Sequence, residues 1–114
     1  FVERRDAPVL MAHLDVYPNP NTAANGFPYL LELQAGLLGD MPTAVVAPLG
    51  LPKVIDQIPV LRLSPTVTSD GQRLVVMAQE LAAIKRRQLK TPVANLSAQR
   101  EEILAALDFL FTGF

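Results

Sequence analysis

The sequence predicts a mainly β protein, a small antiparallel barrel or sandwich that ends in a single α-helix. Short segments along most of the chain alternate apolar and polar residues and are separated by turn-forming residues, as antiparallel strands are. The last segment instead repeats its apolar residues at helical spacing. The length of 114 residues suits one domain, and 50% hydrophobic residues suit a packed core.

Strands are first predicted at 13–17 and 29–34, where apolar side chains occupy alternate positions and therefore one face. A long loop rich in proline, asparagine and glycine joins them. The segment 43–47 is continuously small and apolar with two valines, as expected of a central strand. Three prolines then predict irregular or edge structure: Pro48, Pro52 and Pro59.

A hairpin is predicted around Asp70 and Gly71, because this dipeptide tolerates the positive φ of a tight turn. Its strands are expected at 66–68 and 73–77, after a short strand at 60–63. The hairpin adds to the evidence for an antiparallel sheet.

The segment 79–89 holds good helix formers in a chain that otherwise has the pattern of strands. Propensity is a weak guide where a sheet surrounds the segment. We therefore predict one helical turn near Glu80, followed by a strand from about Lys85.

The C-terminal helix is predicted to begin at Ser97, a favourable N-cap residue, with Glu101 and Glu102 near the positive end of its dipole. One apolar stripe runs along it: Ile103, Leu107, Leu110, Phe111 and Phe114. Gly113 lies where a residue with positive φ commonly closes a helix. A helix this short is marginal alone, so it must dock. We expect the stripe as far as Leu110 to join the core and the last residues to contact a partner.

Composition sets further limits on the class of protein. The charged fraction is 18% and the net charge is −1, which gives no general attraction to nucleic acid or anionic lipid. The chain has no cysteine and no apolar run of about 20 residues, so disulfides and membrane spans are not expected. We expect a cytoplasmic protein, with residues 1–10 an extension of unknown origin and residues 11–114 the domain.

The sequence offers little for catalysis. His13 is the only histidine, and no phosphate-binding glycine motif or nucleophile elbow is present. Glu101 and Glu102 are consecutive, so they diverge from a helix and suit its dipole better than acid–base chemistry. The sequence therefore predicts a protein that is not an enzyme, uses no metal or cofactor, and acts by binding.

One basic cluster stands out, formed by Lys85, Arg86, Arg87 and Lys90. Such a cluster is typical of a solvated or charge-guarded strand edge. Alternatively it contacts an acidic peptide or nucleic acid. No aromatic residues interleave it, which weakens the nucleic-acid alternative.

Four segments together resemble the CcdB family of toxins, from near Met11 to the last residue. They are Leu31-Glu32-Leu33-Gln34-Ala35-Gly36-Leu37-Leu38, Val45-Val46-Ala47-Pro48-Leu49, Leu63-Ser64-Pro65-Thr66-Val67 and the ending from Ile103 to Phe114. The resemblance implies a small SH3-like antiparallel barrel with a C-terminal helix (CcdB/MazF-type), assembled as a homodimer. It also implies a toxin of a toxin–antitoxin system that binds the A subunit of DNA gyrase and traps the enzyme on cleaved DNA.

The resemblance also implies site residues and a second partner. The contact with gyrase falls on the helix end and on an aliphatic pair in a loop: Asp108, Phe111, Thr112, Gly113, Phe114, Leu37 and Leu38. A CcdA-like antitoxin, whose disordered tail wraps the toxin, removes it, and the candidate contacts with it are Lys85, Arg86 and Arg87. No membrane and no specific nucleic acid is implied.

Thr112 departs from the best-known family ending, which has Trp immediately before the terminal pair. A Trp buries a large area and becomes an interface hot spot, which Thr does not. Two alternatives therefore stay open. One is a MazF-like endoribonuclease toxin in which His13 moves protons. The other is a degenerate member of the family that only binds its antitoxin.

Overall fold

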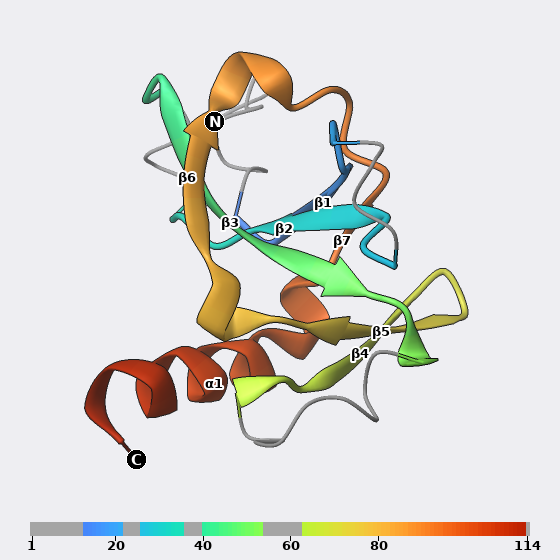
Figure 1. Ribbon diagram of the computed structural model, residues 1–114, viewed down its shortest axis with the longest axis vertical. Coiled ribbons are helices and arrows are strands. Elements are labelled where there is room, and N and C mark those ends of the chain that lie inside the picture. The colour runs from blue at the N-terminus through green and yellow to red at the C-terminus, as the bar shows by residue number, and fades with distance from the viewer. Residues whose placement is uncertain (1–12, 22–25, 36–39, 54–62, 114) are drawn as a thin grey trace.

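The computed structural model describes residues 13–21, 26–35, 40–53 and 63–113. In these residues seven strands form an antiparallel sheet that curls into a nearly closed barrel, with one C-terminal helix (Figure 1). The strand order is β4-β5-β3-β2-β1-β7, and β6 pairs with β3. The bounds are β1 (Asp15–Pro18), β2 (Tyr29–Glu32), β3 (Thr43–Gly50), β4 (Thr66–Ser69), β5 (Gln72–Val76), β6 (Ala82–Lys85), β7 (Ala94–Asn95) and α1 (Arg100–Thr112). The predicted fold class is confirmed.

The first two predicted strands are present, and β1 is buried more completely than predicted. Leu14 and Val16 enter the main core, as the alternation indicated. Asp15 and Tyr17, on the other face, are 4% and 6% exposed, so β1 is not half-buried. Part of that face is covered because Ile84 of β6 and Leu89, which follows β6, pack against a small second cluster of buried residues.

The prediction of irregular or edge structure is wrong at Pro48, because this residue lies within the central strand β3. One edge of β3 pairs with β2. The other edge pairs with β6 through residues 43–46 and with β5 through Leu49 and Gly50. Pro48 falls between these two ladders, where its missing N–H removes no strand pairing. Its carbonyl still accepts a hydrogen bond from the Met77 amide at 3.0 Å.

The predicted hairpin is confirmed as β4 and β5. Asp70 and Gly71 form its turn with φ of 51° and 77°. Both values are positive, as a two-residue turn matched to the sheet twist requires.

The segment after β5 is partly as predicted. The helical turn near Glu80 is present as the 3₁₀ turn η5 (Ala78–Glu80). The strand is β6, however, which begins at Ala82 and ends at Lys85, where the strand was predicted to begin. Its position is set by pairing with the first half of β3, a long-range partner that local propensity does not reveal. The 3₁₀ turn η6 (Arg86–Gln88) follows.

A glutamine side chain closes the gap between the two ends of the sheet. Gln99 belongs to the 3₁₀ turn η7 (Ser97–Gln99), which follows the edge strand β7. Its Oε1 accepts a hydrogen bond from the amide of Thr68 on β4 at 2.9 Å, and its Nε2 donates to the Thr68 carbonyl at 2.8 Å. The amide group thus takes the place of a neighbouring strand along the edge of β4.

Ser97 was predicted to be the N-cap of the helix, and this prediction is wrong. It opens η7, and its amide donates to Oδ1 of Asn95 at 2.8 Å. The helix α1 begins only at Arg100, and its N-cap residue Gln99 makes no side-chain capping bond. The Gln99 side chain is instead engaged with β4.

The barrel encloses one main hydrophobic cluster. Its buried members are Leu14, Val16, Leu31, Ala47, Leu49, Val67, Leu74, Val76, Leu96 and Ile103. Most strands and the first half of α1 therefore share one interior. Residues 1–10 and the part of the predicted strand at 60–62 lie outside the described residues. In the described part, no helix is long and apolar enough to cross a membrane.

Candidate protein-binding site

The helix α1 has a docked half and a projecting half. In Figure 1 its first turns lie beneath the sheet, and its last turns extend beyond the sheet to the C-terminus. Ile103 and Ala106 are each only 1% exposed. Leu107 and Leu110, which were expected in the core, are only partly buried, because the helix has passed the sheet by that point.

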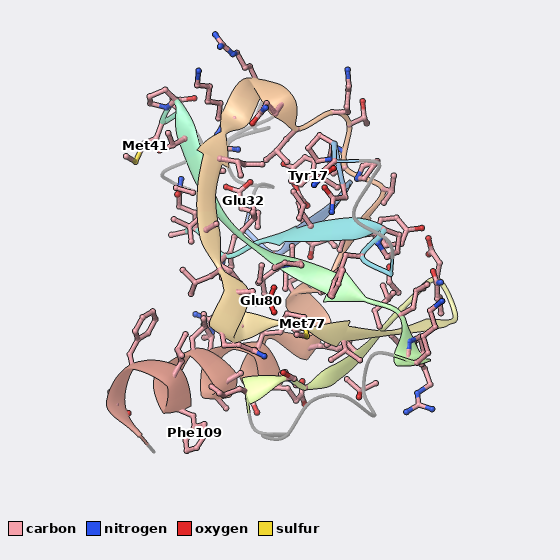
Figure 2. The ribbon with its side chains drawn as sticks, viewed as in Figure 1. Tyr17, Glu32, Met41, Met77, Glu80 and Phe109 are labelled. Carbon is pink, nitrogen blue, oxygen red and sulfur yellow. The ribbon has the colours of Figure 1, made fainter. Side chains whose placement is uncertain are left out.

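Phe111 is the most exposed large hydrophobic side chain of the described residues, at 70%. It lies on the projecting half, as does the partly buried Phe109 (Figure 2). Burying one such side chain against a partner contributes about 1.5 to 3 kcal/mol. The projecting half therefore has the composition of a short hydrophobic anchor.

The helix ends as the sequence predicts. Gly113 has a φ of 81°, and its amide donates to the Phe109 carbonyl at 2.9 Å, which closes the last turn. The hydroxyl of Thr112 donates to the Asp108 carbonyl at 2.6 Å, so it is engaged within the helix. Asp108 itself is exposed. The structure thus brings these predicted contact residues together with Phe111 on one helix end.

Three other predicted contact residues lie outside the described residues: Leu37, Leu38 and Phe114.

The basic cluster divides into residues with different roles. Arg86 forms a two-point ion pair with Glu32 of β2, with Nη1–Oε1 and Nη2–Oε2 distances of 3.1 and 2.5 Å. Its Nε also donates to the Met41 carbonyl at 3.1 Å. Arg86 therefore fastens β6 and η6 to the barrel. Lys85 and Arg87, on either side of it, are exposed.

Glu32 is the centre of a buried polar group that the sequence pattern did not reveal. Its side chain is fully buried, although its position in the alternation was on the more polar face of the strand. Arg86 lies 54 residues away in sequence, so no local spacing indicates the pair. The hydrogen bond to Glu32 is the largest cause that raises the pKa of Arg86.

Tyr17 and Asp15 complete this buried polar group. Burial, followed by the negative charge of Glu32, raises the pKa of Tyr17 from 10.0 to about 12 (Figure 2). Burial is also the main cause that raises the pKa of Asp15, and its hydrogen bond from Asn95, of 2.9 Å, opposes the rise. These groups join β1, β2, η6 and β7, so their arrangement is structural.

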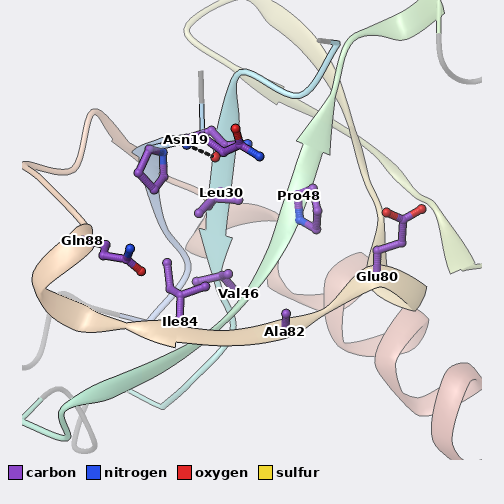
Figure 3. A pocket seen from close by; sticks show the side chains of 10 residues that line it. Asn19, Leu30, Val46, Pro48, Glu80, Ala82, Ile84 and Gln88 are labelled. Atoms are coloured by element: carbon purple, nitrogen blue, oxygen red, sulfur yellow. Dashed lines mark hydrogen bonds between the residues drawn. The ribbon is translucent and has the colours of Figure 1, made fainter. Parts of the chain in front are cut away.

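A groove of about 320 Å³ opens on the second face of the sheet (Figure 3). Its floor is aliphatic and its rim carries amides, and it is lined by Asn19, Pro20, Asn21, Leu30, Val46, Pro48, Glu80, Ala82, Ile84 and Gln88. Among the described residues in this lining Glu80 is the one titratable group. The groove therefore presents no acid–base pair of the kind that hydrolysis uses.

His13, the candidate of the endoribonuclease alternative, lies at the entry to β1. Its Nδ1 donates to the Gln34 carbonyl at 3.0 Å, which joins the ends of the first two strands. Within the described residues, no group of three or more histidine, aspartate or glutamate side chains is placed to hold a metal ion.

A family model provides an independent comparison. No curated protein matches the sequence. The model of the family described as CcdB protein matches residues 13–113, which is nearly the whole chain and includes the barrel and the projecting half of α1. The chain therefore belongs to the CcdB family.

Proposed function

We propose that this protein is the toxin of a toxin–antitoxin pair, which binds the A subunit of DNA gyrase and traps the complex of gyrase with cleaved DNA. Membership of the CcdB family supports a toxin. The observation that carries the choice of site is the projecting half of α1, where Phe111 is 70% exposed at a helix end closed by Gly113. The toxin would act by binding, in the cytoplasm, where its target is.

The contact with gyrase combines an aromatic anchor with a fixed helix end. Phe111 supplies apolar area, and the left-handed Gly113 ends the helix immediately after Thr112. Thr112, whose hydroxyl is bonded to the Asp108 carbonyl, offers less area than the family's Trp. More of the binding energy therefore depends on the two phenylalanines. Leu37 and Leu38 are proposed to add a second, smaller contact.

A homodimer would present two such helix ends. The outer edge of β6 supports this part of the proposal. Arg86 donates its amide to Pro42 on the β3 side, so the amides of Ala83 and Lys85 point to the opposite edge. No strand of the described residues pairs with that edge. An unpaired edge beside partly exposed helix residues suits self-association.

The test is a DNA cleavage assay with purified gyrase, ATP and supercoiled plasmid, in which the protein is titrated. We expect linear DNA to accumulate after denaturation with detergent and protease. A chain that lacks residues 112–114 should remain folded by circular dichroism and lose this effect. Supercoiling by gyrase that proceeds unhindered at saturating wild-type protein would refute the proposed target.

Each of the two alternative functions predicts a different experimental result. Incubation of total RNA with stoichiometric protein tests the endoribonuclease hypothesis, which predicts discrete cleavage products. The degenerate-member hypothesis predicts that expression without an antitoxin is harmless. Toxicity that needs residues 112–114, with intact RNA, is expected from the proposal alone.

A further inference from the structure

Residues 82–92, which we call the strap, comprise β6, η6 and the residues that follow, and none of them is buried. The strap ends where the amide of Val93 donates to the Val16 carbonyl of β1 at 2.8 Å. Regions with few buried apolar side chains open locally at a lower free energy than the whole fold. We propose that the strap opens as one unit while the barrel and α1 stay folded, with the ion pair of Arg86 and Glu32 as its latch.

The sheet does not depend on the strap for its own pairing. The strap pairs with the sheet through β6 alone, which lies along the first half of β3. The other edge of β3 has separate partners. The Leu33 amide donates to the Val45 carbonyl at 2.8 Å, and the Val45 amide donates to Oε1 of Gln34 at 3.0 Å. The first half of β3 therefore stays held to the β2 side when β6 leaves.

The strap buries little apolar surface against the barrel. Its two apolar contacts with the sheet, Ile84 and Leu89, are only partly buried. The cluster beneath them has three buried members, which are Leu30, Ala44 and Val46. The groove of about 320 Å³ remains open beside this contact, with Ile84 on its wall (Figure 3). The main cluster contains no residue of the strap. The strap therefore gains little of the apolar burial that stabilises the barrel.

Arg86 supplies the strongest attachment of the strap. Its amide donates to the Pro42 carbonyl at 2.8 Å, and its Nε donates to the Met41 carbonyl at 3.1 Å. Its two terminal nitrogens bind the fully buried carboxylate of Glu32. Opening of the strap removes the cationic partner of this carboxylate, and a buried charge without a partner is costly. The closed state is therefore held mainly by one residue rather than by packing.

The open strap is a substrate for a protease that cleaves after basic residues. Such a protease must take the side chain of the residue before the cleaved bond into its own specificity pocket. In the closed strap the guanidinium of Arg86 is bound to Glu32 and is not free for this. Cleavage after Arg86 in the folded protein therefore requires the strap to open, and its rate follows the population of the open form.

Hydrogen exchange of the full chain, measured by NMR, tests the opening without any substitution. The amides of Ile84 and Arg86 face β3, because the Arg86 amide donates to Pro42 and alternate amides share an edge. After correction for intrinsic rates, we expect both to exchange about 100-fold faster than the amides of Leu14 and Leu96, which are bonded within the barrel. Equal exchange of the two pairs would overturn the proposal, because the strap would then open only with the whole fold.

A matched pair of variants tests the latch. R86K keeps the positive charge but loses the planar two-point contact with Glu32, so the strap amides should exchange about tenfold faster and the barrel amides as before. R87K makes the same change at the neighbouring exposed side chain and should alter neither set. An unchanged strap in R86K would contradict the latch. Equal acceleration of strap and barrel would contradict it too, because the pair would then stabilise the whole fold.

A disulfide provides the reverse test by locking the strap. Val45 and Ala83 are opposite each other in register, and the alternation set by the bond of Arg86 to Pro42 makes them a pair without hydrogen bonds. The Cα atoms of such a pair are close enough for a disulfide, and the chain has no other cysteine. In oxidised V45C/A83C, with no free thiol left, exchange at Ile84 should slow and cleavage by trypsin after Arg86 should stop. A reductant should restore both, and cleavage that continues at the wild-type rate in the oxidised variant would overturn the proposal.

Discussion

The two halves of α1 carry the same apolar stripe and have different surroundings. Ile103, on the first half, is 1% exposed and belongs to the barrel core. Phe111, two turns later, is 70% exposed, because the helix has passed the edge of the sheet. An amphipathic pattern therefore shows that a face is apolar but not what covers it. In this protein the barrel covers one half, and we propose that gyrase covers the other.

The largest expected effect comes from the docked half. Ile103→Ala should lower the free energy of unfolding by about 2–5 kcal/mol, because it opens a cavity in the main cluster. The measurement is urea denaturation followed by far-UV circular dichroism. A loss no greater than that of Phe111→Ala would contradict the distinction between the two halves.

The next largest effect is a loss of stability at alkaline pH, which depends on Tyr17 in the buried polar group of the barrel. The pKa of Tyr17 is raised from 10.0 in the unfolded reference to about 12 in the fold, chiefly by burial. The stability linked to this group is therefore complete below pH 10 and falls as the pH rises towards 12. Tyr17→Phe should flatten this alkaline decline in denaturation curves. The same decline in the variant would show that another group causes it.

A smaller effect is expected where the chain enters α1. Gln99→Ala removes both hydrogen bonds to the Thr68 backbone and should cost about 1 kcal/mol, because water replaces them at an exposed site. Hydrogen exchange at the Thr68 amide should become faster, whereas the exposed Gln72→Ala provides a control that leaves it unchanged. Unaltered exchange at Thr68 would mean that the side chain of Gln99 does not close the barrel.

Local patterns in the sequence predict the parts of the fold that are made locally. Asp70 and Gly71 form the expected turn because each adopts positive φ. Gly113 closes the helix for the same reason. The mainly β class followed from alternation and turn residues, and the projecting end of α1 was expected to be available to a partner.

Features made by distant residues were not predictable in this way. The pair of Glu32 and Arg86, and the contact of Gln99 with Thr68, depend on segments that meet only after the barrel forms. Pro48 sits in a central strand because two different strands share that edge of β3. For the candidate site, the sequence grouped Lys85, Arg86 and Arg87 together. In the structure Arg86 has a different role from Lys85 and Arg87, because its charge is paired with the buried carboxylate of Glu32.

The smallest expected effect on stability comes from a substitution in the projecting half of α1. The same substitution gives the most direct test of the proposed contact with gyrase. Phe111→Ala should change the free energy of unfolding by less than about 0.5 kcal/mol, because the side chain is exposed. Val93→Ala, at another exposed apolar side chain, provides the matched control. The measurement is gyrase-dependent DNA cleavage at equal concentrations of the two variants. We predict linear DNA with Val93→Ala and its near loss with Phe111→Ala; equal cleavage by both folded variants would contradict the claim that this helix end binds gyrase.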